Sequence, residues 1–330
     1  MSTIRDVAKL AGVAPITVSR VINNDGYFSE ETRRKVEAAV LELDYIPNSL
    51  GPSLRSKRTQ TLALVLSDIT NPFWTTVARG VEDAANKRGY HIIIGNTDES
   101  AEKQEEYLLF LMKKQVDGFL FVPASYNVSN TLQKRHVPFV VLDRRFPSKQ
   151  VDSVRGDSVG GAIGLIKHLL DFGHRRIAVI TGRQDHTTAI DRVDGYLQAL
   201  KEAGVNDVHQ IYWGEYTQQA GYENTVRVLQ TNARPTAIFA TNNFIAIGVM
   251  RALRDAGVRV PEDMSVVAFD DLPAAITVDP FFTVAAQPDY EMGQIATDLL
   301  LSRLAGNGPE EPQEIVLPVE IIVRKSSAKL

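Results

Sequence analysis

Residues 3–23 of the chain read TIRDVAKLAGVAPITVSRVIN. Apolar residues recur at helical spacing on both sides of a glycine: Ile4, Val7, Ala8 and Ala11 before Gly12, and Val18, Val21 and Ile22 after it. Thr3 suits the N-cap of the first helix, with Asp6 three residues later, and Pro15 suits the opening turn of the second. The stretch therefore predicts two short helices around a tight turn.

The outward side of the second helix combines short hydroxyl groups, a small apolar surface and one arginine. These features come from Pro15, Ile16, Thr17, Ser19 and Arg20. Such side chains can contact phosphates and base edges in the major groove of DNA. The alternative is a small solvated pair of helices without a partner, and the mixture of side chains favours the DNA-binding interpretation.

The composition sets limits on the rest of the chain. It has 330 residues, 44% hydrophobic and 23% charged, which is typical of a globular protein with two or three domains. The absence of cysteine excludes disulfides and thiolate zinc ligands, and fits a reducing compartment. No apolar run has membrane-spanning length, and the N-terminus lacks the apolar core of a signal peptide, so we expect a cytoplasmic protein.

The charge is unevenly distributed along the chain. Residues 1–58 contain nine Lys/Arg and seven Asp/Glu, a net charge of +2, so residues 59–330 carry −6 of the total of −4. Basic clusters lie at residues 33–35 and 55–58. A locally basic segment on an acidic body is the electrostatic pattern expected of a DNA-binding regulator with a separate sensor.

Beyond the first two helices, the pattern predicts a different architecture. A third helix is expected over residues 30–43 with Ser29 as N-cap, and residues 49–61 form a linker. Apolar segments of strand length then alternate with helical segments. The expected strands are 62–66, 91–94, 118–122, 139–142, 177–180, 211–213, 237–240 and 265–269, and the expected helices include 73–88, 101–114 and 159–171. This alternation predicts parallel sheets covered on both faces by helices.

The alternation restarts near residue 177, so we predict two Rossmann-like lobes. Gly89-Tyr90 and Gly204-Val205 each close an equivalent first helix, which indicates internal duplication. We expect a ligand cleft between the lobes, at the carboxyl ends of the strands. Segments 315–317 and 319–323 have strand composition around Pro318 and are expected to help the chain cross back between the lobes.

Motifs along the whole chain resemble the lactose/galactose repressor (LacI/GalR) family of bacterial transcription regulators. They are DVAKLAGV (6–13), TVSRV (17–21), SEETR (29–33), YIPN (45–48), DITNPF (68–73), QVDG (115–118), GHRRI (173–177), RVDGY (192–196), ATNN (240–243), VPED (260–263) and FDD (269–271). The resemblance implies an α/β fold with two Rossmann-like lobes of periplasmic-binding-protein type, preceded by a small all-α helix-turn-helix headpiece. It also implies a homodimer that binds a pseudo-palindromic DNA operator and responds to a small-molecule effector.

The expected domains are a headpiece at 1–47, a hinge segment at 48–60 and an effector-binding core at 61–330. Within the core, about 61–160 and 291–318 would form the N-lobe, and about 161–290 and 319–330 the C-lobe. No leucine-rich helix follows the last expected strand, so we expect a dimer rather than a tetramer.

The resemblance directs Pro15, Ile16 and Arg20 toward DNA bases. The other expected DNA contacts are Thr3, Thr17, Ser19, Asn23, Ser29, Leu54 and Arg55. Leu54 and Arg55 match a family hinge helix whose leucine wedges into the minor groove, but Gly51-Pro52 replaces the usual Ala-Arg. We therefore expect a shorter hinge helix that starts near Pro52, or one that forms only on operator DNA.

The expected effector site lies at the strand ends. Its candidates are Phe73, Trp74, Arg144, Arg192, Tyr216, Asn242, Asp270 and Gln287. Trp74 offers a stacking platform for a sugar ring. The resemblance implies that Arg192, Asp270 and Asn242 contact the effector, that Tyr216 lies near a second aromatic wall and that Gln287 is a rim contact.

Several classes of effector and function stay open. A neutral mono- or disaccharide is favoured by the family and by Trp74. A sugar acid or sugar phosphate is favoured by Arg144, Arg145 and Arg192, and by Asn243 in place of the family's aspartate. We expect Arg144 and Arg145 to make the cleft mouth more positive. A nucleobase effector and a protein corepressor are further alternatives.

Other classes of protein fit less well. A solute-binding protein would share the core but would need a signal peptide and lack the headpiece. An enzyme is not supported, because the six histidines are scattered and no Walker loop or zinc-ligand spacing occurs. The glycines of residues 160–164 lie inside a helical pattern. We therefore expect no catalysis, cofactor or metal, and no membrane partner.

Overall fold

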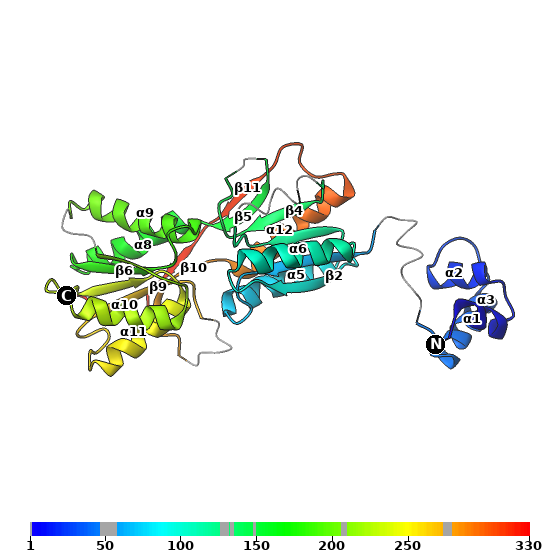
Figure 1. Cartoon of the computed structure of the whole chain (residues 1–330), viewed down its shortest axis with the longest axis horizontal. Coiled ribbons are helices and arrows are strands. Elements are labelled where there is room, and N and C mark those ends of the chain that lie inside the picture. Colours follow the sequence, from blue (N-terminus) through cyan, green and yellow to red (C-terminus); the bar gives the residue numbers. More distant parts are fainter. Residues whose placement is uncertain are drawn as a thin grey trace. The chain divides into compact units, whose positions relative to one another are not determined.

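The computed structural model describes residues 2–46, 58–125, 132, 135–147, 150–205, 210–272 and 279–330 (Figure 1). The chain divides into two compact units, Met1–Thr59 and Gln60–Leu330. Leu54, Arg55 and the Gly51-Pro52 segment lie outside the described residues, so the hinge helix stays a prediction.

The smaller unit is a three-helix headpiece, α1 (Ile4–Ala11), α2 (Pro15–Ile22) and α3 (Glu30–Glu42). Thr3 and Asp6 form a reciprocal capping box at α1, and Ser29 caps α3 by accepting from the Thr32 backbone N–H at 3.2 Å. Gly12 ends α1 in the left-handed conformation, with φ 66°. These features confirm the predicted helix boundaries. The apolar faces meet in one small core, with Val7, Val18 and Val36 fully buried.

The larger unit contains two six-stranded sheets, ordered β11-β5-β4-β3-β1-β2 and β12-β10-β9-β8-β6-β7. The strands of the first are β1 (Thr61–Leu66), β2 (His91–Asn96), β3 (Gly118–Phe121), β4 (Phe139–Leu142), β5 (Asp152–Gly156) and β11 (Glu314–Leu317). The strands of the second are β6 (Ile177–Thr181), β7 (Gln210–Trp213), β8 (Ala237–Ala240), β9 (Ser265–Phe269), β10 (Thr283–Ala286) and β12 (Glu320–Ile322). The strand pairs are parallel, apart from the antiparallel pair of β10 and β12.

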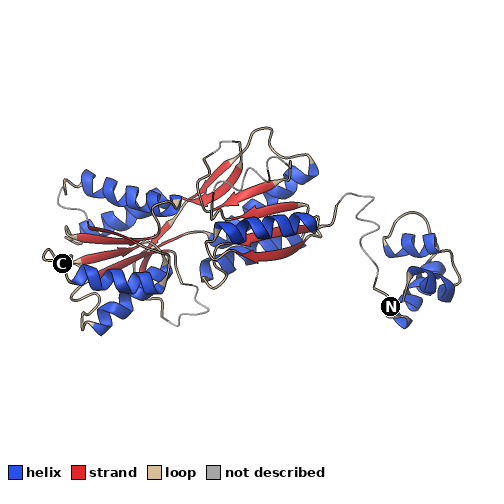
Figure 2. Ribbon diagram, viewed as in Figure 1, coloured by secondary structure: helices blue, strands red, loops and turns tan. Residues whose placement is uncertain are grey.

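Helices cover both faces of each sheet (Figure 2). They are α5 (Pro72–Asn86), α6 (Ala101–Lys113), α8 (Ser158–Asp171), α9 (Thr187–Glu202), α10 (Gln218–Leu229), α11 (Asn243–Asp255) and α12 (Asp289–Ala305). In the first lobe, Leu62 and Leu64 of β1 pack toward α5 and α12, whereas Ala63 and Val65 pack toward α6. In the second lobe, α8 and α9 cover one face and α10 and α11 the other. The predicted α/β fold with two Rossmann-like lobes is confirmed.

The two lobes repeat one topology. In the two strand orders, β1 has the same position as β6, β3 the same as β8, and β4 the same as β9. Gly89 and Gly204, just beyond α5 and α9, both adopt positive φ values of 73° and 69°, which confirms their equivalent roles. The chain passes between the lobes after β5, after β10 and through Pro318 between β11 and β12. The expected lobe bounds near residues 160, 290 and 318 lie at these three crossings, but the strands β5 and β10 were not predicted.

Close packing of α5 on α12 depends on two glycines. A Cβ atom on Gly80 would lie 2.1 Å from the Tyr290 carbonyl oxygen, and one on Gly293 would lie 2.2 Å from that of Val77. Because both obstacles are backbone atoms, we expect Gly80→Val to lower the free energy of unfolding by about 3 kcal/mol. Urea unfolding measures this. Gly89→Asn is the control, since nothing lies within 4 Å there and asparagine tolerates positive φ. An unchanged midpoint for Gly80→Val would contradict the close packing.

Candidate functional site

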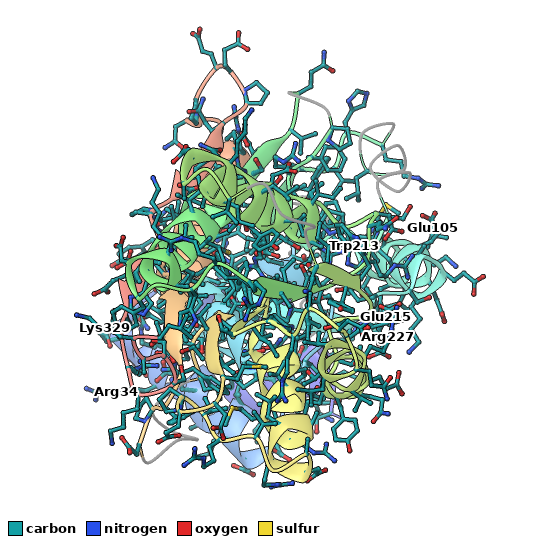
Figure 3. All side chains as sticks on the ribbon, turned by 90° about the vertical axis from the view of Figure 1, so that its left-hand side faces the viewer. Arg34, Glu105, Trp213, Glu215, Arg227 and Lys329 are labelled. Atoms are coloured by element: carbon teal, nitrogen blue, oxygen red, sulfur yellow. The ribbon has the colours of Figure 1, made fainter. Side chains whose placement is uncertain are left out.

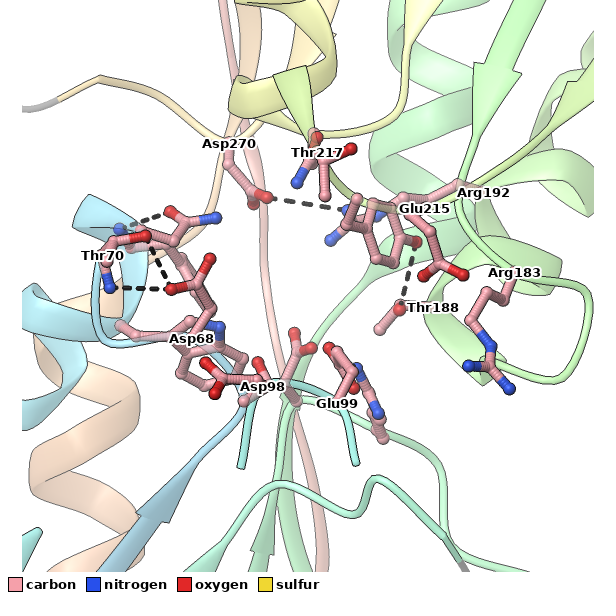
Figure 4. A pocket seen from close by; sticks show the side chains of 18 residues that line it. Asp68, Thr70, Asp98, Glu99, Arg183, Thr188, Arg192, Glu215, Thr217 and Asp270 are labelled. Atoms are coloured by element: carbon pink, nitrogen blue, oxygen red, sulfur yellow. Dashed lines mark hydrogen bonds and ion pairs between the residues drawn. The ribbon is translucent and has the colours of Figure 1, made fainter. Parts of the chain in front are cut away.

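A cavity of about 600 Å³ lies between the two lobes of the core, where loops leave the carboxyl ends of strands from both sheets (Figure 4). Its lining is Ser67, Asp68, Thr70, Asn71, Phe73, Trp74, Asp98, Glu99, Asp143, Arg144, Arg183, Thr188, Arg192, Glu215, Tyr216, Thr217, Asn242 and Asp270. Its size is that of a small-molecule site. The carboxyl ends of parallel strands place it where doubly wound folds bind ligands.

Seven of the eight residues expected at the effector site line this cleft. Gln287 does not. It follows β10 at a crossing between the lobes, where its Nε2 donates to Asp270 Oδ1 at 2.7 Å. A Cβ atom on Gly156, at the end of β5, would lie 1.9 Å from Gln287 Oε1. The structure therefore assigns Gln287 to the support of Asp270 at the lobe crossing.

The centre of the cleft is an arginine between two buried acids. Asp143 and Asp270 directly follow the equivalent strands β4 and β9, and both have positive φ values, 64° and 65°. Arg192 Nη1 lies 3.6 Å from Asp270 Oδ2, and its guanidinium carbon lies 3.8 Å from the centre of the Phe269 ring (Figure 4). Each lobe thus contributes one carboxylate from the same position of its repeat.

Burial changes the protonation of the two cleft acids, Asp143 and Asp270, and of the nearby His186. Burial and the nearby Asp270 raise the pKa of Asp143 to about 6, although Arg192 and Arg144 act in the opposite direction. Burial also raises the pKa of Asp270, against the effect of Arg192. His186, behind the cleft wall, is neutral at pH 7 because burial and Arg144 lower its pKa to about 4. The cleft can therefore hold a proton on its acids in mildly acidic solution.

This protonation predicts a pH dependence of stability. A raised pKa favours the protonated carboxyl in the folded state, so the contribution of Asp143 is present below its unfolded pKa near 4 and is lost as pH rises through 6. Asp143→Asn, which resembles the protonated acid, should raise the free energy of unfolding by about 3 kcal/mol at about pH 7.5 and by about half as much at about pH 5, midway between the two pKa values. Thermal unfolding at both pH values measures the difference. The control is Asp98→Asn: the hydrogen bond from Lys103 lowers the pKa of Asp98, so this variant should lose stability. Equal effects of Asp143→Asn at both pH values would contradict the assignment.

The expectation of a more positive cleft mouth is wrong. Arg144 Nη2 bonds Glu99 Oε1 at 2.5 Å, and Arg145 Nη2 bonds Asp191 Oδ1 at 2.6 Å. Burial alone would raise the pKa of Glu99, but the Arg144 guanidinium, with smaller effects from His186 and Ser67, holds that pKa below its usual range. Among the residues that the structure describes, the lining has six carboxylates against three arginines: Asp68, Asp98, Glu99, Asp143, Glu215 and Asp270 against Arg144, Arg183 and Arg192. The cleft is therefore acidic.

Aromatic side chains come from both lobes. Phe73 and Trp74 occupy the first turn of α5, which Asn71 caps by accepting from the Phe73 backbone N–H at 3.0 Å. Their rings meet edge to face, with centroids 4.7 Å apart. In the other lobe, Tyr216 lies 3.3 Å from Thr188 through their hydroxyls and stacks on His186. Such surfaces can contact the apolar face of a sugar ring.

Several buried polar atoms of the cleft have no hydrogen-bond partner within the described part of the chain. They include Glu99 Oε2, Asp143 Oδ1 and Arg192 Nε. Unsatisfied buried groups are costly, so their concentration in one cleft indicates a place for a polar ligand. Asp143, the Asp98-Glu99 pair and Glu215 line the cleft but were not among the predicted effector contacts. Their positions within three residues of the ends of strands β4, β2 and β7 were the available signal.

The described residues contain no group of three or more His, Asp or Glu side chains that could hold a metal ion. Nor do they include a helix long and apolar enough to cross a bilayer. Charged side chains of both signs cover the core surface, exposed Arg227 and Lys329 among them (Figure 3).

The exposed side of α2 in the headpiece presents the side chains expected to contact DNA. Pro15, Ile16 and Arg20 are exposed, with Ile16 at 51%, whereas Thr17 and Ser19 are half-buried. No hydrogen bond or ion pair to the Arg20 guanidinium occurs among the residues that the structure describes. Asn23 donates to the Ser19 carbonyl oxygen at 2.7 Å, and Thr3 and Ser29 serve as N-caps.

Comparison with known proteins identifies both units. Residues 3–48 match the model of bacterial regulatory proteins of the lacI family, and residues 166–327 match a periplasmic binding protein-like domain. A ribose operon repressor of Escherichia coli strain K12 is 36% identical and aligns over 99% of this chain and 100% of its own length. The chain belongs to the LacI family.

Solved structures agree with this assignment to the LacI family. A Lac repressor dimer bound to operator and the anti-inducer ONPF aligns with a TM-score of 0.88 at 27% identity, covering 99% of each chain. A LacI-family regulator from Enterococcus faecium with bound ribose aligns with a TM-score of 0.73 at 33% identity, covering 82% of this chain and 99% of its own. The family explains the two units as a DNA-binding headpiece and a ligand-responsive core.

Proposed function

We propose that this LacI-family regulator represses a carbohydrate-utilisation operon and that a neutral sugar binds in the cleft to control its hold on the operator. The observation that carries the proposal is the cluster of buried polar atoms without partners, Glu99 Oε2, Asp143 Oδ1 and Arg192 Nε, between aromatic walls. A sugar supplies hydroxyl groups for such atoms and an apolar ring face for Trp74. Ribose in the E. faecium regulator supports this ligand class.

The charges favour a neutral sugar over an anion. Arg144 is bonded to Glu99, and Arg192 lies beside Asp270, so neither cation is left uncompensated for a carboxylate or phosphate ligand. The three further carboxylates Asp68, Asp98 and Glu215 would repel an anion. Sugar hydroxyls can instead donate to Asp143 and Asp270, with Arg192 donating to a ring or hydroxyl oxygen. Asn242 and Tyr216 complete the proposed contacts.

The headpiece would act on DNA in pairs. We assign Pro15, Ile16 and Arg20 to bases and Thr17, Ser19, Asn23 and Ser29 to phosphates, with Thr3 acting through its cap. An apolar patch of Ile93, Ile94, Leu109 and Phe110, each 36–48% exposed on β2 and α6, is the proposed contact with a second copy. The Lac repressor, which is a dimer when bound to its operator, supports a pair of headpieces on DNA. Such a protein acts in the cytoplasm, on DNA, and without catalysis.

Two measurements test the proposal. A thermal-shift screen of the full chain against D-ribose, D-glucose, cellobiose, gluconate, ribose 5-phosphate and hypoxanthine should show a rise in Tm with a neutral sugar. Fluorescence anisotropy with a fragment from upstream of the chain's own gene should then show that this sugar changes operator affinity. A shift only with the anions or with hypoxanthine would overturn the neutral-sugar assignment, and operator affinity that no cleft ligand changes would overturn the switch.

A further inference from the structure

We infer that two polar contacts between the lobes, Asn71–Asn243 and Arg145–Asp191, act as latches that hold the cleft closed and thereby set effector affinity. Both contacts join residues that belong to different lobes and adjoin the cleft lining. The Arg145 latch also includes the bond from its backbone N–H to Thr187 Oγ1, at 3.0 Å. The link to affinity rests on the proposed function, whereas the link to closure does not.

The first latch joins the N-termini of two helices. Asn71 caps α5 in the first lobe, and Asn243 is the first residue of α11 in the second. Asn243 Nδ2 lies 3.0 Å from Asn71 Oδ1, and both side chains are buried. Asn71 orients Phe73 and Trp74 of the cleft, and Asn243 follows Asn242, so the bond holds two cleft walls together.

The identity of Asn243 matters for this bond. The Phe73 backbone N–H fixes Asn71 Oδ1 as an acceptor at 3.0 Å, so the atom that Asn243 presents to it must be a donor. An aspartate at position 243 would place an acceptor against an acceptor. It would nevertheless suit the helix itself, because a negative charge is favourable at a helix N-terminus. An amide at this position therefore serves the contact between the lobes rather than α11.

The second latch is an ion pair between the sequence neighbours of the cleft arginines Arg144 and Arg192. Arg145 follows Arg144 in the first lobe, and Asp191 precedes Arg192 on α9 of the second. Arg145 Nε lies 3.0 Å from both oxygens of Asp191, and its Nη2 lies 2.6 Å from Oδ1. Asp191 is 5% exposed, so its charge depends on this partner. The pair thus fixes the start of α9 against the segment that carries Asp143 and Arg144.

The fraction of molecules in the closed form connects closure of the cleft to effector affinity. A ligand that contacts both lobes binds the closed form, so its apparent Kd rises as the closed fraction falls. Losing a buried hydrogen bond and placing two acceptor oxygens against each other shifts such an equilibrium by about tenfold. Asn243→Asp should therefore weaken closure by about tenfold while leaving α11 folded.

The test measures lobe distance without sugar or DNA. The chain has no cysteine, so spin labels can be placed on the full-length protein at the exposed positions Glu102→Cys of α6 and Lys201→Cys of α9. Because the protein is expected to pair through α6, the labelled chain is mixed with an excess of unlabelled chain, so that most labelled dimers carry one labelled copy. Double electron–electron resonance should then give one distance for the labelled parent. Asn243→Asp should add a second population at longer distance. Asn71→Asp is the matched control: it keeps the acceptor and the helix cap, so the distances should stay unchanged.

Asp191→Asn tests the second latch and keeps the inference falsifiable if Asn243→Asp fails to fold, which circular dichroism would show. Asp191→Asn should add a population at longer distance. High salt should add a similar population to the parent protein, because Arg145 is 46% exposed and salt can screen its ion pair with Asp191. Distances in Asn243→Asp and Asp191→Asn identical to those of the parent would overturn the inference. A negative sugar screen would leave these distances unaffected, so failure of the proposed function and failure of the latches are distinguishable.

Discussion

Replacing Arg192 with methionine should abolish the response to effector and strongly destabilise the core. The side chain is 4% exposed and lies within 3.6 Å of Asp270, and its charge also lowers the pKa of Asp143. Without it, two buried carboxylates face each other with no central cation. Breaking a buried pair in this way costs about 3–5 kcal/mol. Urea unfolding at about pH 7.5 measures the loss, and operator anisotropy with D-ribose and D-glucose measures the response.

Three further variants separate charge from packing. Arg192→Met combined with Asp270→Asn should recover much of the lost stability, because one of the two uncompensated charges is gone. Arg192→Lys retains the cation but loses the planar group stacked on Phe269. Arg183→Met is the matched control in the same cleft: Arg183 is 43% exposed and pairs with exposed Asp185, so we expect a change below about 0.5 kcal/mol. An Arg192→Met protein as stable as its parent would contradict the central role of Arg192.

The fold could be predicted where residues follow a local pattern. Strands such as β1 and β9 are continuous apolar runs, and the caps Thr3 and Ser29 are local signals. Strand β5 was missed because its sequence, DSVRG, is mostly polar. The structure buries Asp152 there because Arg303 of α12 bonds both of its oxygens, at 2.7 and 2.9 Å. That partner lies 151 residues away, beyond any local pattern.

In the candidate site, too, some features could be predicted from the sequence and others could not. The positions of Arg192 and Asp270 followed from the motifs RVDGY (192–196) and FDD (269–271), and the structure places both in the cleft. The net charge of the cleft could not be predicted from these motifs. Arg144 and Arg145 are compensated by Glu99 and Asp191, which lie 45 and 46 residues away in the sequence. Sequence position therefore predicted which residues gather in the cleft, but not how their charges balance.

Replacing Arg20 with alanine should weaken operator binding and relax its sequence preference. Arg20 is the cation of the exposed side of α2 and has no acidic partner among the described residues, so it is available for a bidentate bond to guanine. Each lost contact costs about 1–3 kcal/mol, and in a dimer both half-sites lose one. Anisotropy titrations against the operator and a scrambled duplex, over a range of salt, measure the effect.

The control for Arg20 distinguishes base contacts from phosphate contacts. Arg34 is exposed on α3 and carries the same charge. Arg34→Ala should weaken binding to the operator and the scrambled duplex alike, and reduce the salt slope by about 1 where it meets a phosphate. Arg20→Ala should instead lose operator affinity selectively, because a base contact distinguishes sequences and a phosphate contact does not. Equal losses on both duplexes for Arg20→Ala would assign it to the backbone, and sequence recognition would then depend on Pro15 and Ile16.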